Sequence, residues 1–143
     1  MYRVVLDPFV MLRGLLNRRS PCACLLSDYS DRYRAVFSED TIRAIRLLLV
    51  HPILIAAFPR LPRLGQSHLA QAFLAAECIP VERESDTSVF VAAARAAKVD
   101  FLVSEDPALL ADQAAVGVPV LDSRAFLSLL DPDRFSCQGK GEM

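Results

Sequence analysis

Short apolar runs alternate with longer amphipathic stretches along the chain. The apolar runs predict buried strands over residues 2–6, 35–37, 79–81, 99–104 and 118–121. The amphipathic stretches have apolar residues at helical spacing, and they predict helices over residues 8–16, 21–29, 38–51, 67–76, 87–97, 108–115 and 122–130. Strands that alternate with helices are typical of a parallel sheet with right-handed crossovers and helices on both faces. We therefore expect an α/β fold, a three-layer α/β/α sandwich around a central parallel sheet.

Two segments between the predicted helices are harder to interpret from their pattern. Residues 53–58 are apolar, and they fit either a short helix or an irregular segment. Residues 59–65, PRLPRLG, contain two prolines and a glycine, which predicts a loop. The segment also carries Arg60 and Arg63, which together with Arg43 and Arg46 could contact RNA phosphates, although solvated surface arginines are the simpler interpretation.

Length and composition predict one domain with a substantial core. The chain has 143 residues, of which 53% are hydrophobic and only 5 are glycine, a composition that argues against disorder. No composition shift or repeat divides residues 1–131, so we expect them to form a single domain. Residues 132–143 are polar, and we expect them to be a flexible C-terminal tail.

Charge and hydropathy patterning exclude several classes of protein. The formal net charge of −1 gives no general attraction to nucleic acid, although it does not rule out a local basic patch. No apolar run is long enough for a membrane span, and the first residues lead directly into a predicted strand rather than a signal peptide. The four cysteines do not have the spacing of a zinc site and fit small core residues in a reducing compartment. We therefore expect a cytoplasmic protein without membrane contact.

Carboxylates at strand-to-helix junctions are the strongest candidates for chemistry. Asp7 and Asp106 each follow a predicted strand and precede a proline, and Asp86 precedes the predicted helix at 87–97. An aspartate before a first-turn proline is a good helix cap, so capping alone could explain each position. Capping is compatible with a second role, because the carboxyl ends of parallel strands share one edge of a sheet, where α/β proteins hold their ligands.

Three carboxylates gathered at one edge would repel one another unless a cation neutralised them. Mg²⁺ or Mn²⁺ prefers oxygen ligands and could polarise a water against a phosphodiester. Other common sites are not supported, because the chain has no glycine-rich dinucleotide motif, no lysine-bearing phosphate loop and no Ser-His-Asp arrangement. The residues therefore favour a metal-dependent hydrolase of phosphate esters.

Four stretches of the chain, which together span residues 2–130, resemble the PIN domain family. MYRVVLDPFVMLRGLL resembles its opening strand, aspartate and helix, and FSEDTIRAIRLLLVHP resembles its serine-capped third helix. ESDTSVFVAAARAAKVDFLVSEDPALL resembles its most diagnostic acidic segment, and GVPVLDSRAFLSLL its closing strand and helix. The order and spacing of these stretches identify the chain as similar to the VapC-like toxins of this family.

The resemblance implies a function and a set of site residues. PIN domains of this kind are Mg²⁺- or Mn²⁺-dependent ribonucleases that cleave single-stranded RNA and form the toxin of a bacterial toxin–antitoxin pair. By resemblance, Asp7, Asp86 and Asp106 would be the catalytic residues and metal ligands, and Ser104 a supporting hydroxyl. The resemblance also implies a cognate antitoxin as a partner and a homodimer.

The chain departs from the family pattern at two positions. Phe9 stands where the family usually has asparagine, and Ala44 stands where it usually has a glutamate. One acid of the usual site is therefore missing, although another acidic residue could substitute for it: Glu39, Asp40, Glu82, Glu84 or Glu105. The departures leave open a catalytically degenerate PIN domain that acts as an RNA- or protein-binding module. A Mg²⁺-dependent phosphohydrolase acting on small phosphate esters is a third interpretation.

Overall fold

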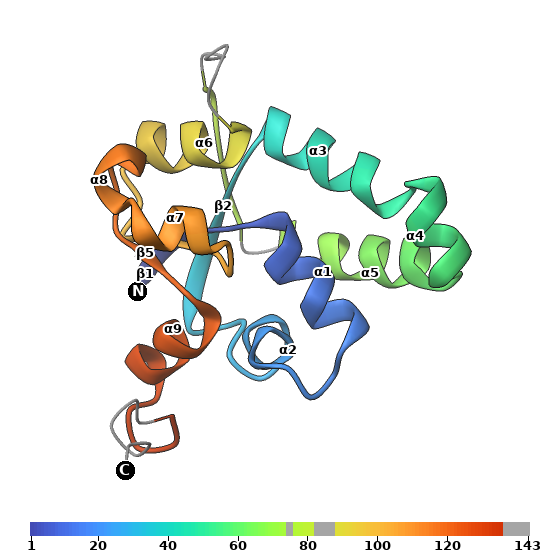
Figure 1. Ribbon diagram of the computed structural model, residues 1–143, viewed down its shortest axis with the longest axis horizontal. Coiled ribbons are helices and arrows are strands. Elements are labelled where there is room, and N and C mark those ends of the chain that lie inside the picture. The colour runs from blue at the N-terminus through green and yellow to red at the C-terminus, as the bar shows by residue number, and fades with distance from the viewer. Residues whose placement is uncertain (74–75, 82–87, 136–143) are drawn as a thin grey trace.

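The computed structural model describes residues 1–73, 76–81 and 88–135, and it has the predicted α/β fold. Five parallel strands form one sheet in the order β3-β2-β1-β4-β5, with bounds Tyr2–Leu6 (β1), Tyr33–Ser38 (β2), Glu77–Ile79 (β3), Phe101–Val103 (β4) and Val120–Leu121 (β5). The helices of the described residues are α1 (Pro8–Leu16), α2 (Pro21–Leu26), α3 (Glu39–Leu49), α4 (Pro52–Ala57), α5 (Leu61–Phe73), α6 (Val89–Ala97), α7 (Pro107–Ala111), α8 (Gln113–Val116) and α9 (Ser123–Leu130). Figure 1 shows these elements in place.

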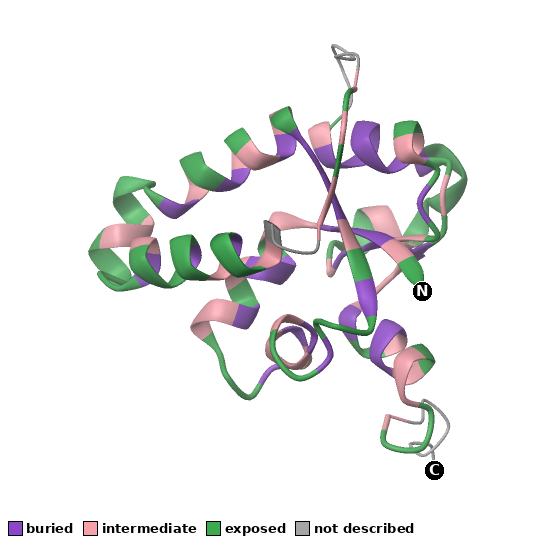
Figure 2. Cartoon of the chain, turned by 180° about the vertical axis from the view of Figure 1, so that it is seen from behind, coloured by how far each residue is buried: buried purple, intermediate pink, exposed green. Residues whose placement is uncertain are grey.

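Helices cover both faces of the sheet, as the predicted three-layer architecture requires. Successive side chains of a strand point to opposite faces, so β1 contributes Val5 to one core cluster and Val4 and Leu6 to another. Helices α3, α5 and α6 supply buried residues to the cluster on the Val5 side, whereas α2 and α9 supply them on the Val4 side. Figure 2 shows buried residues in the strands and on the helix sides that face them.

Several predicted helix starts near the sheet are confirmed. Helix α1 has the predicted bounds Pro8–Leu16, with Asp7 as its cap. Ser38 caps α3, and a reciprocal hydrogen-bond pair joins Ser38 to Thr41 at the third helical position. Asp122, one of two predicted candidates, caps α9. Caps of this kind satisfy backbone donors at a helix start, which is why these residues define the boundaries.

The prediction of a loop over residues 59–65 is wrong, because α5 begins at Leu61. Leu61 is fully buried and anchors the first turn, and Pro62 is tolerated there because a proline near a helix start loses no hydrogen bond. Gly65 lies against α3, where a Cβ atom on it would come within 2.4 Å of Leu49 Cδ1. The glycine therefore allows two helices to approach closely and does not end a helix.

Other elements differ from the predictions in their bounds. Strand β3 begins two residues earlier than predicted, at Glu77, and the predicted helix over 108–115 is divided into α7 and α8 by the non-helical backbone of Asp112. Gly117 ends α8 as predicted, with a φ of 88° that suits glycine. Residues 53–58, which fit two interpretations, mostly belong to α4.

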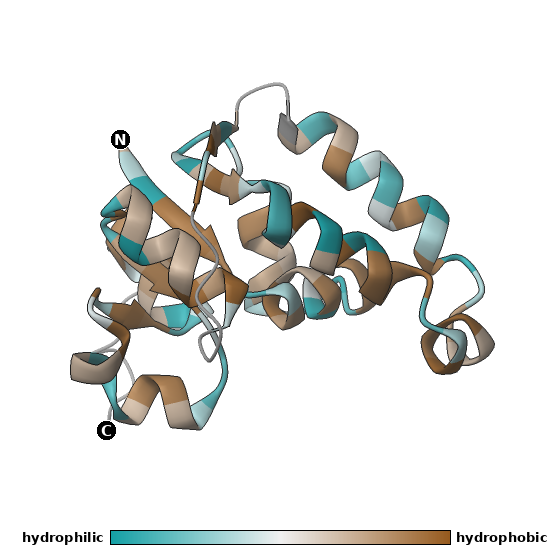
Figure 3. Ribbon diagram, turned by 90° about the horizontal axis from the view of Figure 1, so that it is seen from above, coloured by the Kyte–Doolittle hydropathy of each residue, from teal (hydrophilic) through white to brown (hydrophobic). Residues whose placement is uncertain are grey.

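The helices α3, α4 and α5 form an extension with exposed apolar side chains at its tip. Helix α4 buries none of its residues, and its Ile53 is 73% exposed. Leu47, Val50, Phe58 and Leu64 are also exposed around it. Figure 3 shows the ribbon of α4, at the end of this extension, mostly in the colour of hydrophobic residues. Exposed apolar residues grouped in this way are typical of an interaction surface.

The described part of the predicted tail, residues 132–135, contacts the domain. Phe135 packs edge-on against Tyr29, with ring centroids 5.5 Å apart, and the Tyr29 hydroxyl donates to Asp131. The rest of the predicted tail, residues 136–143, lies outside the described residues. Among the described residues, no helix has the length and apolar character needed to cross a membrane.

Candidate functional site

Two of the predicted acidic residues meet at the carboxyl ends of β1 and β4. These strands are neighbours, with Leu6 paired to Val103, and the backbone N–H of Asp7 donates to the Val103 carbonyl at 2.9 Å. The chain therefore leaves both strands at the same edge of the sheet. Asp7 directly follows β1, Asp106 follows β4 after Ser104 and Glu105, and each aspartate caps a helix.

Ser104 joins the two aspartates through one hydroxyl group. Its Oγ donates to Asp7 Oδ2 at 3.1 Å and accepts from the backbone N–H of Asp106 at 3.0 Å. Ser104 is 0% exposed, and its two partly buried hydrogen bonds fix the relative position of the two chain segments. The structure thus places the predicted supporting hydroxyl between two predicted site residues.

The electrostatic environment of Asp7 is unfavourable for its charged form. Burial raises the pKa of Asp7, and the negative charges of Asp106 and Glu105 raise it further. Hydrogen bonds from the Phe9 backbone N–H and from Ser104 act in the opposite direction but do not cancel the effect of burial. Neither Asp7 nor Asp106 forms an ion pair with another of the described residues. A bound cation would compensate for this accumulation of negative charge.

Glu105 is the acidic residue that the structure adds to this edge. Its Oε1 accepts a hydrogen bond from the Ser123 hydroxyl, and the Cys22 thiol donates to the same atom at 3.6 Å. Other substitutes considered for the missing acid are placed elsewhere, since Glu39 and Asp40 both pair with Arg43 on α3. Glu82 and Glu84 lie outside the described residues. The sequence signal for Glu105 is its position between Ser104 and Asp106.

The third predicted ligand, Asp86, lies outside the described residues. The helix that Asp86 was expected to introduce, α6, begins at Val89 and is capped by Ser88. Within residues 1–73, 76–81 and 88–135, no group of three or more His, Cys, Asp or Glu side chains is arranged to hold a metal ion. The structure therefore brings together Asp7 and Asp106, with Ser104 between them, and leaves the role of Asp86 as a prediction.

The donor set at this edge fits a hard divalent cation. Mg²⁺ is commonly held through one or two carboxylates and keeps several of its waters, so it needs no complete protein cage. Asp7 and Asp106 each use one Oδ1 atom to cap a helix, at 2.8 and 2.9 Å from the backbone nitrogen. The Oδ2 atom of Asp106 accepts no hydrogen bond from the described residues, and Asp7 Oδ2 accepts only that of Ser104. These oxygens remain available for a cation.

The two departures from the family pattern have different surroundings. Phe9 follows the Asp7 cap and is 62% exposed at the edge of the site. Ala44 is half-buried on α3 and packs against the core cluster on the Val5 side of the sheet. The side chain at position 44 therefore contacts the core, whereas the exposed side chain at position 9 is available to a ligand.

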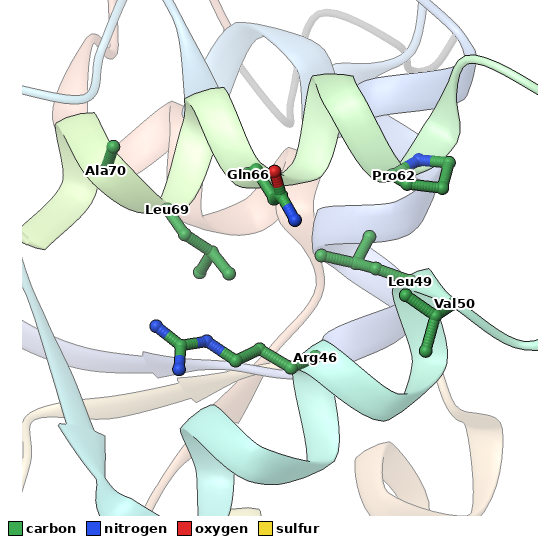
Figure 4. A pocket seen from close by; sticks show the side chains of 7 residues that line it. All are labelled: Arg46, Leu49, Val50, Pro62, Gln66, Leu69 and Ala70. Atoms are coloured by element: carbon green, nitrogen blue, oxygen red, sulfur yellow. The ribbon is translucent and has the colours of Figure 1, made fainter.

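A separate cavity of about 440 Å³ lies between α3 and α5. It is lined by Arg46 and Leu49 from α3, by Val50 directly after α3, and by Pro62, Gln66, Leu69 and Ala70 from α5. Figure 4 shows Arg46 and Leu69 pointing toward each other across it. The cavity is mainly apolar and contains no acidic residue, so it has none of the chemistry of the carboxylate edge.

Comparison with known proteins supports the fold. Neither the models of known protein families nor the curated proteins match the chain. Among solved structures, the chain is similar to a chain of VapBC2 from Rickettsia felis bound to a DNA fragment from their promoter. The TM-score is 0.54 at 8% sequence identity, and the match covers 84% of this chain and 98% of the other. At this identity the similarity shows a shared fold, the PIN-like α/β architecture that the sequence predicts.

Proposed function

We propose that the chain is a Mg²⁺- or Mn²⁺-dependent endoribonuclease that cleaves single-stranded RNA. The observation that carries this proposal is the placement of Asp7 and Asp106 side by side at the carboxyl edge of a parallel sheet, joined by Ser104. The raised pKa of Asp7 supports it, because a carboxylate that faces other carboxylates at a sheet edge is typical of a functional site.

Each residue of the site has a distinct role in this proposal. Asp7 and Asp106 would hold the cation through their Oδ2 atoms, and Asp86 remains the predicted third ligand. Ser104 would act as a positioning residue, because its hydroxyl orients Asp7 and holds the backbone of Asp106. When bound, Mg²⁺ supplies a polarised water and neutralises charge on the phosphodiester. The half-buried position of Asp7 strengthens its interaction with a cation relative to the same pair in water.

We further propose that the protein is the toxin of a bacterial toxin–antitoxin pair and acts in the cytoplasm. The shared fold with a chain of the VapBC2 structure supports this assignment. The exposed apolar residues around α4 support a protein partner, either the cognate antitoxin or a second copy in a homodimer. Light scattering of the purified chain, with and without co-expressed antitoxin, measures both associations. If Ile53→Glu leaves both complexes intact, the tip of this extension is not the interface.

RNA cleavage tests the proposed function. Wild-type protein should cleave a labelled single-stranded RNA in Mg²⁺ and lose this activity in excess chelator. Asp106→Asn keeps a capping side chain but removes the charge, and it should lower the cleavage rate at least about a hundredfold. Asp112→Asn, which changes an exposed carboxylate outside the site, is the matched control. Equal rates for wild type and Asp106→Asn would remove Asp106 from the mechanism.

A degenerate PIN domain that binds without cleaving is the second candidate function. The observations that favour it are the core contact of Ala44 and the aromatic side chain at Phe9, which replace two polar family positions. Under this alternative the protein still binds RNA or a protein partner, but the labelled RNA gives the same pattern of products in Mg²⁺ and in chelator. A cleavage product that requires both Mg²⁺ and Asp106 would exclude it.

A further inference from the structure

Two adjoining cavities open beside the carboxylate edge and have opposite character. The first, about 340 Å³, has a mainly apolar lining that includes Phe9, Leu12 and Leu16. The second, about 450 Å³, is mainly polar, and its lining includes three arginines, Arg13, Arg19 and Arg124. Arg13, Asn17 and Glu105 line both, so the cavities meet along one boundary. They lie where α1 and α2 pack together, near the start of α9 (Figure 1).

Both cavities are lined by Glu105, a neighbour of the proposed reaction centre in the sequence. Glu105, on their shared boundary, directly precedes Asp106, and its charge acts on Asp7. Phe9 is also held at this centre, because its backbone N–H donates to Asp7 Oδ1 at 2.8 Å. A polymer with a phosphate held at Asp7 and Asp106 would therefore have these cavities beside it.

The three arginines of the polar cavity are exposed and available to an external anion. Among the described residues, none of Arg13, Arg19 and Arg124 forms an ion pair or donates a side-chain hydrogen bond. The two acids in the same lining are already engaged, since Glu105 accepts from Ser123 and Asp122 caps α9 at 2.7 Å from Ala125 N. Phosphate is the anion that guanidinium groups recognise best.

The apolar cavity offers a surface for a planar ring. Phe9 exposes 62% of its surface beside the aliphatic side chains of Leu12 and Leu16, although burial would stabilise an aromatic ring. Proteins that bind single-stranded nucleic acid stack bases on exposed aromatic side chains and hold the backbone with nearby cations. A base next to Phe9 and a phosphate next to the arginines reproduce the repeating unit of such a strand.

We propose that the Phe9 cavity and the Arg13–Arg19–Arg124 cavity together form a nucleotide subsite for single-stranded RNA, next to the phosphate that is cleaved. The base stacks on Phe9, and the adjoining phosphate binds the three arginines. This inference rests on the proposed function and assigns a binding role to the residue that departs most visibly from the family pattern. The arginines favour RNA over a protein segment, because an apolar peptide would leave their charges without partners.

Binding in excess chelator tests the arginine half of the subsite, because cleavage is then absent. A short labelled single-stranded oligoribonucleotide is titrated with wild type, with the triple variant Arg13→Gln, Arg19→Gln, Arg124→Gln, and with a control triple variant. The control, Arg32→Gln, Arg34→Gln, Lys98→Gln, removes the same charge from exposed positions outside both cavities. We expect the cavity variant to bind at least about tenfold more weakly and to lose about 0.7 of the salt slope per arginine, and the control to stay within about threefold of wild type.

Substitution of Phe9 tests the stacking half. Phe9→Ala should weaken binding about tenfold, whereas Phe9→Tyr keeps an aromatic ring and should bind like wild type. An oligonucleotide with abasic positions provides the second control, because it has no base to stack and should bind wild type and Phe9→Ala equally. Circular dichroism melting shows that each variant is folded, which these exposed positions lead us to expect.

Several results would overturn the proposal. It is wrong if wild type does not bind the oligonucleotide in chelator, if the cavity variant binds like wild type, or if the control loses as much affinity as the cavity variant. If Phe9→Ala weakens only the complex with a protein partner, the apolar cavity is a protein-docking surface instead. The proposed function fails separately, in the Mg²⁺ cleavage assay, so binding with the expected pattern but without cleavage supports the subsite and rejects the nuclease.

Discussion

Opposite charges are paired at one edge of the sheet, whereas like charges lie together at the other. At the amino edge, the Arg3 guanidinium donates two hydrogen bonds to Glu77, at 2.9 and 2.5 Å, and the Arg3 backbone N–H donates to Asp100. The pair raises the pKa of Arg3 and lowers the pKa of Glu77. At the carboxyl edge, Asp7 faces Asp106 and Glu105, and its pKa is raised by burial and by their charges.

This contrast distinguishes an edge that stabilises the fold from one suited to a ligand. Opposite charges at the amino edge favour the folded state without help from outside the chain. Like charges at the carboxyl edge disfavour it, and such an arrangement persists in a protein where a function requires it. The contrast therefore predicts that removal of a carboxylate charge has opposite effects on stability at the two edges.

Removal of the hydroxyl between the aspartates should have the largest effect on stability. Ser104→Ala removes a fully buried hydroxyl and leaves the Asp106 backbone N–H and one Asp7 oxygen without their shared partner. We expect a loss of about 1–3 kcal/mol in the free energy of unfolding, measured by urea denaturation. Ser30→Ala, at an exposed serine, is the control and should change it by less than about 0.5 kcal/mol. Equal effects would mean that Ser104 does not organise this edge.

Neutralisation of Glu77 should have a smaller effect at the amino edge. Glu77→Gln removes the charge that pairs with Arg3, and we expect a loss of about 0.5–1 kcal/mol at pH 7 and low salt. Because the pKa of Glu77 is lowered in the folded state, this stabilisation is present above the unfolded pKa and disappears as the pH falls through the folded value. Thermal melts of both proteins between pH 7 and pH 3 measure it, and a difference that persists at pH 3 would contradict it.

Neutralisation of Asp7 should have the smallest effect on stability and the opposite sign. Asp7→Asn keeps a capping side chain at the start of α1 but removes the charge. Because the pKa of Asp7 is raised in the folded state, the ionised carboxylate disfavours folding at pH 7, and this penalty vanishes once the pH falls below the unfolded pKa. Without metal, the variant should melt above wild type at pH 7 and equal to it in acid. A lower melting temperature at pH 7 would show that the edge is not electrostatically strained.

The sequence predicts the local features of this molecule well. Asp7, Ser38 and Gly117 mark element boundaries through their own backbone chemistry, so their positions could be predicted from local pattern alone. The helix that begins within residues 59–65 could not be predicted in this way, because proline and glycine usually end helices. Here Pro62 lies in the first turn of α5, and Gly65 makes a close contact with Leu49. That contact joins two helices, and local pattern does not specify which helices meet.

The candidate site is predicted in part for the same reason. Strand-end aspartates in a parallel sheet share an edge, which predicts Asp7 and Asp106 together, but the adjacency of β1 and β4 joins residues 97 positions apart in the sequence. Arg13 and Arg124 line one cavity because α1 and α9 both pack against α2, which no spacing along the chain encodes. The part of the site that depends on contacts between distant elements could therefore not be predicted from the sequence pattern.

Calorimetric titration with Mn²⁺ at pH 7 tests most directly whether the carboxyl edge is a cation site. We predict saturable binding to wild type, at least about tenfold weaker binding to both Asp7→Asn and Asp106→Asn, and unchanged binding to Glu77→Gln, which alters a carboxylate at the opposite edge. Affinities that are the same in wild type and in both aspartate variants would contradict the account.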